Sequence, residues 1–433
     1  MSTAADDALR AALGPLNAGH TLGRYELLAP VGRGGMAVVW AARQSGTRGF
    51  SKLVAVKTML PSLAADPRFE RMFLREAELS ARVRHPNVCP ILDLGEQDGT
   101  LYLVMEWVDG ESLAALRALA DDAGRAIPVA VAAHAVAQAA RGLHAAHTLV
   151  DDAGAPAGIV HRDVSPHNVL VRRDGHVLVV DFGVAKAMES SDHATQSGTI
   201  KGKIAYLAPE QAEGRPLDAR ADVFALGVVL YELTTGAHPF RGTTDVATLL
   251  RISGPEAPPP PVELVEGFPP ALSDAIMKAL AKDPVVRHRS AADLARELEA
   301  IGAAGGVDAA ERTAAFVEEL GAGHRTALAA DLARAVELAD ERRARREAEP
   351  DGAALAAPTR RPSSRSRTAV VAAVAVAAGV GIGVSWMRSS APADGEPSLA
   401  ARLRASALPP LATSAPSVAT SGASATAEAA SSA

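Results

Sequence analysis

Two short polar motifs joined by two apolar runs restrict what this chain can fold into more than any other feature. The first is HRDVSPHN at positions 161–168, and the second is DFG at positions 181–183. The runs 169–172 and 177–180 lie between them and predict two strands of a hairpin, which would bring Asn168 and Asp181 to one end. Their amide and carboxylate oxygens suit Mg²⁺, and Asp163 is placed to accept a proton from a hydroxyl. The motifs therefore predict a magnesium and nucleotide-phosphate site.

The composition is that of a globular, mildly acidic chain. Of its 433 residues 48% are apolar, which is enough for a core. The net charge of −6 and the aromatic content of 3% argue against a nucleic-acid binder, which needs a basic surface and stacking rings. The single cysteine, Cys89, excludes an intrachain disulfide framework and fits a reducing compartment. We expect it to be a small buried apolar residue rather than a reactive thiol.

The order of the predicted elements indicates an α+β fold with two lobes. Short apolar runs separated by turn residues predict antiparallel strands at 25–31, 38–43, 53–59, 91–94 and 101–108. A helix is predicted at 68–83, and the chain is mainly helical from Leu113 to a last helix at 291–301. This order predicts a small β-rich lobe followed by a larger α-rich lobe.

The two ends of the chain differ from its centre. Positions 1–21 are predicted to be a flexible leader, and positions 303–349, rich in alanine and in both charges, a solvated helical stalk. A Pro/Arg/Ser linker at 350–368 leads to the segment 369–387, which contains no charged side chain. Its length is sufficient for a transmembrane helix; the alternative is an alanine-rich linker.

Charges around the apolar segment predict its orientation. Four arginines at 360–367 precede it, and only Arg388 follows closely. The positive-inside rule then places the N-terminal part in the cytoplasm and the Ala/Ser/Pro-rich tail, 388–433, outside the cell membrane. Gly379 and Gly383 would allow two such helices to pack as a homodimer in the lipid bilayer.

A glycine-rich segment and a lysine extend the predicted phosphate site. The segment GRGGM, 32–36, lies between two predicted strands, where glycines let backbone N–H groups approach a phosphate; the alternative is an ordinary glycine hairpin. Lys57 lies near the end of the third predicted strand, and Glu76 lies within the predicted helix that follows it. Each alone is more simply a surface residue. Together with the glycines, an ion pair that orients the Lys57 ammonium toward phosphates is the better interpretation.

Taken in order, these motifs resemble those of protein kinases of the bacterial, eukaryotic-like (Hanks) serine/threonine type, here with one C-terminal membrane helix. The resemblance covers positions 22–302 and implies the bilobal protein-kinase fold, with a small lobe at 22–107 and a large lobe at 108–302. It implies ATP and Mg²⁺ as cofactors and proteins as substrates. Asp163 would be the catalytic aspartate, and Lys57 would bind phosphates and pair with Glu76. Asn168 and Asp181 would be the metal ligands.

The resemblance also implies which residues surround the nucleotide. Met105 would be the gatekeeper, and backbone groups of Glu106 and Val108 would bond adenine. The other ATP-binding residues would be those of the glycine-rich loop and apolar residues on either side of the base: Val31, Gly32, Arg33, Gly34, Gly35, Met36, Ala37, Val38, Val39, Ala55 and Leu170.

The segment 181–210 would form the activation segment. In the family its end, Ala208-Pro209-Glu210, is fixed by an ion pair, which here would join Glu210 to Arg287, and Asp222 would brace the catalytic loop. Arg162 would gather a phosphate on this segment. We expect autophosphorylation among Thr195, Ser197 and Thr199.

Three departures from the family pattern stand out. Ala37 replaces the third glycine of the loop, and an insertion at 149–158 carries Asp and Gly and predicts a surface hairpin. Ser165 takes the place of the catalytic-loop lysine, while Lys203 takes the place of a threonine that packs against that lysine. We interpret the last pair as a charge exchange, in which the Lys203 ammonium replaces the missing one. The alternative is that Lys203 is solvated and Ser165 weakens catalysis.

These observations predict a membrane-anchored protein serine/threonine kinase regulated by activation-segment autophosphorylation. The alternatives are an ATP-binding pseudokinase or scaffold that signals by conformation, and a small-molecule phosphotransferase. The long activation segment, from Asp181 to Glu210, favours a protein substrate. A tyrosine kinase would have arginine at position 167, where this chain has His167, but both usual serine/threonine markers, at 165 and 203, are also absent.

Overall fold

The first lobe is built on a six-stranded antiparallel sheet. In this computed structural model, which describes residues 16–34, 36–64, 66–151, 153–182, 203–303 and 308–348, the strand order is β1-β2-β3-β4-β6-β5. The five predicted strands are all present, and a short additional strand precedes them. Their bounds are β1 Thr21–Leu22, β2 Tyr25–Arg33, β3 Ala37–Ser45, β4 Ser51–Met59, β5 Ile91–Gln97 and β6 Thr100–Glu106, with a short 3₁₀ turn η1 at Thr47–Gly49.

Alternation along β4 divides the first lobe into two apolar clusters. Val54 and Val56 face one cluster, which contains the buried Trp40, whereas Ala55 faces the other, beneath helix α3 (Pro67–Arg82). Side chains along a strand point alternately to its two faces, so Lys57 lies on the same face as Ala55 and points toward α3. The short helix α2 (Pro61–Ala64) leads into α3.

Helix α3 starts at a clear signal. The Asp66 side chain accepts a hydrogen bond from the Arg68 N–H at 2.9 Å, and Pro67 is the first helical residue; both features favour a helix start. Phe73, Ala77 and Glu76 are buried on the face toward the sheet. A single glutamate is thereby placed among apolar residues, and it needs a partner.

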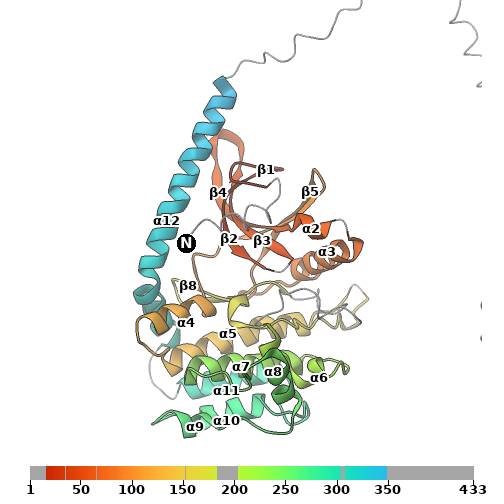
Figure 1. Cartoon of the computed structure of the whole chain (residues 1–433), viewed down its shortest axis with the longest axis vertical. Helices are drawn as coiled ribbons and strands as arrows, with labels where there is room; N and C mark the ends of the chain where they lie inside the picture. The colour runs from red at the N-terminus through yellow and green to blue at the C-terminus, as the bar shows by residue number, and fades with distance from the viewer. Residues whose placement is uncertain are drawn as a thin grey trace, which may run out of the picture. The chain divides into compact units, whose positions relative to one another are not determined.

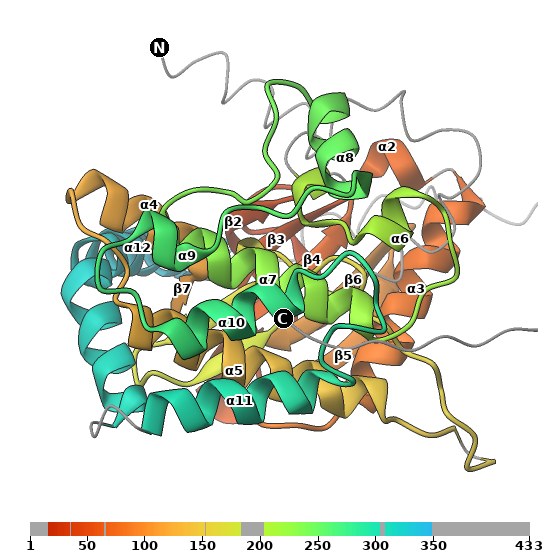
Figure 2. The same cartoon turned by 90° about the horizontal axis from the view of Figure 1, so that it is seen from below.

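The second lobe is mainly helical and surrounds α5 (Val129–His147) and α7 (Arg220–Thr235) (Figures 1 and 2). A small three-stranded sheet in the order β7-β8-β9 lies next to the first lobe. The alanine-rich α5 lets α7 and α11 approach closely, and most of α7 is buried. The bounds are β7 Gly110–Ser112, β8 Val169–Arg172, β9 Val177–Val179, α4 Leu113–Asp122, η2 Pro166–Asn168, η4 Lys203–Tyr206, α6 Pro209–Ala212, α8 Asp245–Ser253, α9 Pro261–Leu264, α10 Pro270–Ala279 and α11 Ala291–Ala303.

One long helix, α12 (Ala309–Ala348), follows the second lobe within the segment predicted as a stalk. It was expected to be solvated, but Phe316, Val317 and Ala339 are buried. Residues 1–352 form one compact unit that includes this helix, and in Figure 1 it runs along one side of both lobes.

Within the described ranges, no helix has both the length and the apolar character needed to span a bilayer. The predicted membrane segment 369–387, its linker and its tail lie outside the described residues, as do Gly35 and the phosphorylation candidates Thr195, Ser197 and Thr199.

Candidate active site

Three charged side chains from three elements meet between the lobes. The Lys57 ammonium of β4 lies 2.6 Å from Glu76 Oε1 of α3 and 3.0 Å from Asp181 Oδ1, which follows β9. Burial disfavours the charged ammonium, but the attraction of Asp181 and Glu76 outweighs it and raises the pKa of Lys57. Burial also raises the pKa of Glu76, against the opposing effect of Lys57. The structure thus contains the ion pair predicted from the sequence and adds Asp181 to it.

The backbone of the predicted catalytic loop, residues 161–168, is held by Asp222, in the first turn of α7. Its carboxylate accepts the N–H of His161 at 2.8 Å and of Arg162 at 2.9 Å, and lies 2.7 Å from His147 Nε2. Burial favours the protonated acid, but the hydrogen bond and the electrostatic effect of His147 outweigh this and lower the pKa of Asp222. His147, the last residue of α5, was not identified from the sequence as part of this support.

Two non-glycine residues of the site adopt the left-handed backbone conformation. Arg162 has φ of 65° and Asp181 has φ of 56°. Such a conformation costs about 1–3 kcal/mol per residue and persists only where the surroundings enforce it. Asp222 enforces it at Arg162, and the bond to Lys57 helps to hold Asp181. Both polar motifs therefore contain a residue with a strained backbone conformation at the place where they turn toward the cleft.

Asp163 and Asn168 are joined directly. Asn168 Nδ2 donates to the Asp163 carbonyl at 2.8 Å and to its Oδ2 at 3.2 Å. The Val180 N–H donates to the Asn168 carbonyl at 3.0 Å, which ties the end of the hairpin to Asp181. Because the Asn168 side-chain nitrogen donates to Asp163, the amide oxygen of Asn168 is the atom available as a ligand.

The β2–β3 turn carries the glycine-rich loop that is predicted to cover the nucleotide. Within this turn the Gly34 N–H donates to the Ala37 carbonyl at 2.8 Å, and the Leu60 N–H donates to the Met36 carbonyl at 2.9 Å. Val31 is 40% exposed at the end of β2, and Leu170 of β8 is half-buried on the other lobe. These two side chains can enclose a flat base between the lobes.

Two details refine the predicted set of nucleotide-binding residues. Val38 is 1% exposed and belongs to the cluster on the far face of the sheet, so its side chain does not face the cleft, while Val39 packs against the cluster beneath α3. The Glu106 N–H already donates to the Pro90 carbonyl at 3.1 Å. The carbonyl of Glu106 and the backbone of Val108 are then the groups left for adenine.

A family model described as protein kinase domain matches residues 25–296. The chain belongs to the protein kinase family. Among its curated relatives, the tyrosine-protein kinase MasK of Myxococcus xanthus is 42% identical over 277 residues, which are 64% of this chain and 43% of that protein. The serine/threonine-protein kinase PknB of Mycobacterium leprae is 39% identical over 283 residues, covering 64% of this chain and 43% of that protein.

A solved structure agrees with this assignment. The kinase domain of PknI from Mycobacterium tuberculosis matches with a TM-score of 0.50 and 31% identity, over 67% of this chain and all (100%) of that domain. The bilobal kinase fold predicted from the sequence is therefore confirmed. The chain spans less than half of the length of MasK and PknB.

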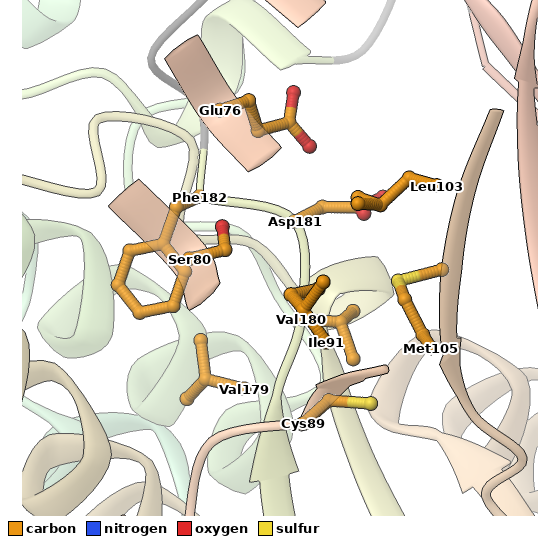
Figure 3. Close-up of a pocket in the computed structure, with 10 residues that line it drawn as sticks. All are labelled: Glu76, Ser80, Cys89, Ile91, Leu103, Met105, Val179, Val180, Asp181 and Phe182. Carbon is orange, nitrogen blue, oxygen red and sulfur yellow. The ribbon is translucent and has the colours of Figure 1, made fainter. Parts of the chain in front are cut away.

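Met105, the predicted gatekeeper, lines a pocket that Figure 3 shows. Ser80 of α3, Cys89 and Phe182 line it together with Glu76 and Asp181. Cys89 is buried, as the sequence predicted, and burial raises the pKa of its thiol to about 12. Ser80 and Phe182 could be found only once α3 and the hairpin were placed side by side.

The end of the activation segment is fixed by a buried ion pair. Arg287 NH1 and NH2 lie 2.6 and 2.8 Å from the two oxygens of Glu210, which is the pairing predicted from the resemblance. Gln211 Nε2 donates to the Arg162 carbonyl at 3.1 Å. This second contact, which the sequence did not reveal, connects the end of the segment to the catalytic loop.

Ser165 occupies the place of the usual catalytic-loop lysine and is 2% exposed. Its hydroxyl is buried without a hydrogen-bond partner among the described residues. Lys203 is the first residue of η4, shortly before Ala208, and its side chain lies outside the described part of the chain. The predicted charge exchange between the two positions therefore stays a prediction.

Proposed function

We propose that this chain transfers the γ-phosphoryl group of ATP to serine or threonine hydroxyls of protein substrates. The observation that carries the proposal is the Lys57 ammonium held between Glu76 and Asp181, on the same cleft as the linked Asp163 and Asn168. Phosphoryl transfer depends on positioning and on neutralising charge. This arrangement supplies a fixed cation for the phosphates and a carboxylate for the attacking hydroxyl.

In the proposed reaction each residue has a distinct task. Lys57 binds the α- and β-phosphates, and Asp163 accepts the hydroxyl proton and orients the hydroxyl. Asn168 and Asp181 would hold Mg²⁺, which when bound neutralises phosphate charge. The donor set fits a hard cation, since it offers an amide oxygen and a carboxylate, and the inward hydrogen bonds of Asn168 Nδ2 orient that amide.

The choice of hydroxyl is the finer part of the proposal. Relatives named as serine/threonine kinases and one named as a tyrosine kinase are similarly close to this chain, and position 167 is histidine rather than the arginine of the tyrosine alternative. Phosphoamino-acid analysis of protein labelled by the full chain with γ-labelled ATP and Mg²⁺ tests it. We expect phosphoserine and phosphothreonine. Phosphotyrosine as the main product would contradict serine/threonine transfer without contradicting kinase activity.

The exchange of Ser165 and Lys203 is part of the proposed mechanism. The buried Ser165 cannot supply the positive charge of the lysine that the family has at this position. Lys203 begins η4, which precedes α6 in the chain, and Gln211 of α6 contacts the catalytic loop. In the proposed exchange the Lys203 ammonium would take over the charge and bind the γ-phosphate beside Asp163. A cation that acts mainly on the transition state contributes about 100-fold or more in rate.

Two variants test the exchange. Lys203→Thr is expected to lower kcat by about 100-fold, whereas Ser165→Lys combined with Lys203→Thr restores much of it; Lys201→Thr serves as the matched control. Full turnover in Lys203→Thr, or no recovery in the double variant, would show that the exchange is wrong.

Autophosphorylation of the activation segment is proposed as the regulatory step. Among the described residues, the half-buried Arg162 guanidinium has no hydrogen-bond or ion-pair partner, while its backbone is fixed by Asp222 and Gln211. A phosphate on Thr195, Ser197 or Thr199 would provide that partner and order the segment. Mass mapping of active protein should find phosphate there, and active protein without phosphate between positions 181 and 210 would contradict the proposal.

Membrane anchoring through the segment 369–387 is also proposed, on the length and flanking charges of that segment. The full chain is expected in the carbonate-resistant membrane fraction. Deletion of 369–387 should release it, whereas deletion of an equally long piece of the tail, 389–407, should not. Equal release of both deletion variants, or release of the full chain, would argue for an alanine-rich linker instead.

A further inference from the structure

Helix α12 lies beyond the part of the chain that matches the kinase family, yet it contacts both lobes. The family match ends at residue 296, and α12 runs without interruption from Ala309 to Ala348. Its 40 residues extend about 60 Å at 1.5 Å per residue, which is enough to pass both lobes. It packs against α4, α5, β7 and β8 of the second lobe and against β2 of the first lobe (Figure 1).

The first third of α12 is anchored in the second lobe. Phe316 is 5% and Val317 0% exposed, and both belong to the main apolar cluster of that lobe. The Arg125 guanidinium lies 5.7 Å from the centre of the Phe316 ring and 2.7 Å from Glu319. Burial of two large apolar side chains favours this attachment before the cost of ordering the helix is subtracted.

The middle of α12 is attached beside the hinge, residues 107–109 between β6 and β7, where the chain passes from the first lobe to the second. His324 Nδ1 lies 2.7 Å from Glu111 Oε1, and Glu111, 5% exposed, is in β7, shortly after Val108. Nearby, Glu318 in the first third of the helix lies 3.1 Å from Arg173, in the β8–β9 turn. The helix is therefore fixed where the chain crosses from one lobe to the other.

The last third of α12 is attached to the sheet of the first lobe. Ala339 is 0% exposed, and Asp340 Oδ1 lies 2.5 Å from Arg43 NH1 of β3. Arg43 is itself only 8% exposed and also pairs with Glu26 of β2 at 2.8 Å. A Cβ at Gly19 would come within 2.6 Å of Arg342 Nε, so the contact at this end is close.

We propose that α12 is an intramolecular strap that holds the two lobes in the arrangement in which Lys57, Glu76 and Asp181 meet. A kinase opens and closes by rotation of its lobes about the hinge. A continuous helix fixed to both lobes and to the hinge opposes that rotation, because opening must break the contacts of Ala339 and Asp340 or bend the helix. The strap thereby favours the closed cleft and tight binding of Mg²⁺-nucleotide.

Two alanines on the same helix provide a matched test. Ala339→Glu places a carboxylate in the buried contact with the first lobe, whereas Ala330→Glu places it at an exposed position, and each has an arginine one helical turn later, Arg343 or Arg334. Spin labels at Glu96→Cys in β5 and Val285→Cys in the second lobe, with the buried Cys89 changed to serine, report the distance between the lobes in the full chain.

In Ala339→Glu the distance distribution should broaden, and the Kd of Mg²⁺·ADP, measured by calorimetry, should rise roughly 5-fold or more, while Ala330→Glu behaves as the parent. Asp340→Asn, which keeps shape and removes the charge, should shift both readouts in the same direction by less, and it replaces Ala339→Glu if that variant does not fold. Distances and Kd values equal to those of Ala330→Glu would overturn the strap.

Discussion

Two buried ion pairs in this chain have similar chemistry but differ in their surroundings. Arg287 and Glu210 are 0% and 3% exposed, and Arg287 also donates to the carbonyls of Ala281 and Arg220 at 2.8 and 2.9 Å. Lys57 and Glu76 are each 11% exposed, and a second carboxylate, Asp181, is 30% exposed at the cleft. One pair is closed and neutral. The other joins one ammonium to two carboxylates, so a negative charge remains for a further ligand to neutralise. The first arrangement is typical of a pair that stabilises the fold, and the second of a pair that serves a binding site.

Replacement of Lys57 should give the largest effect on activity. Lys57→Met removes the cation that is proposed to contact the phosphates, so kcat/KM should fall about 100-fold or more. The melting temperature should fall less than in Arg287→Met, because the carboxylates that lose their partner are more exposed at the cleft. Kinase assays and thermal unfolding measure the two effects. Lys52→Met, at an exposed position of the same strand, is the control, and a similar loss there would break the comparison.

Replacement of Arg287 should give the largest effect on stability. Arg287→Met leaves Glu210 as an unpaired buried carboxylate, so the free energy of unfolding should fall by about 3–5 kcal/mol. Chemical denaturation measures it, with the exposed Arg289→Met as control. Adding Glu210→Gln should recover part of the loss, because the uncompensated charge is then gone. A loss below about 1 kcal/mol would mean that this buried pair contributes no more to stability than an exposed ion pair does.

The pH dependence of stability should report on the site between the lobes, which contains a buried histidine beside Asp163, the proposed catalytic aspartate. Burial lowers the pKa of His161, whose Nδ1 accepts the Asp163 N–H and whose Nε2 faces the Val180 carbonyl at 3.1 Å. The neutral ring contributes stability fully above about pH 6.5, the unfolded pKa. This contribution is lost as the pH falls from there toward the lower folded pKa.

His161→Gln should therefore flatten the fall of the unfolding free energy between about pH 6.5 and 5 by up to about 1.4 kcal/mol per pH unit, the value for one proton. His167→Gln, at an exposed position of the same loop, should leave the slope unchanged. Equal slopes in the parent and His161→Gln would mean that the buried ring takes up a proton in the folded kinase.

The smallest effect is expected at Ser165. Its buried hydroxyl has no hydrogen-bond partner among the described residues, so Ser165→Ala should change the free energy of unfolding by less than about 0.5 kcal/mol. Ser112→Ala should cost about 1 kcal/mol, because Ser112 caps α4 by accepting the Ala115 N–H at 3.0 Å. Denaturant curves compare the two. A larger cost at Ser165 than at Ser112 would mean that the Ser165 hydroxyl has a partner in solution.

Most of the fold and the centre of the site could be predicted because they depend on local pattern and fixed spacing. The strands alternate and the helix at 68–83 has one apolar face, and Lys57 and Glu76 occupy predictable places on them. The closed pair of Arg287 and Glu210, 77 residues apart, followed from the family resemblance rather than from local chemistry.

The remainder depends on which distant elements meet, and the residue pattern does not encode that directly. Helix α12 was predicted as solvated because its contacts with the first lobe are made by small or charged residues, such as Ala339 and Asp340, which leave no apolar stripe. His147 was missed because a histidine at a helix end has no sign of its partner, Asp222, 75 residues later. Val38 was assigned to the cleft, although its neighbour Val39 is the residue on that face.

The central claim is that the cleft in which Lys57, Glu76 and Asp181 meet performs phosphoryl transfer and does not merely bind nucleotide. The most direct measurement is the incorporation of γ-labelled phosphate into protein by the full chain and by Asp163→Asn, with Mg²⁺·ADP binding measured on the same preparations. We expect both proteins to bind nucleotide and only the parent to incorporate label, at least about 100-fold faster than the variant. Equal binding with no transfer above the Asp163→Asn background would contradict the account and identify a pseudokinase.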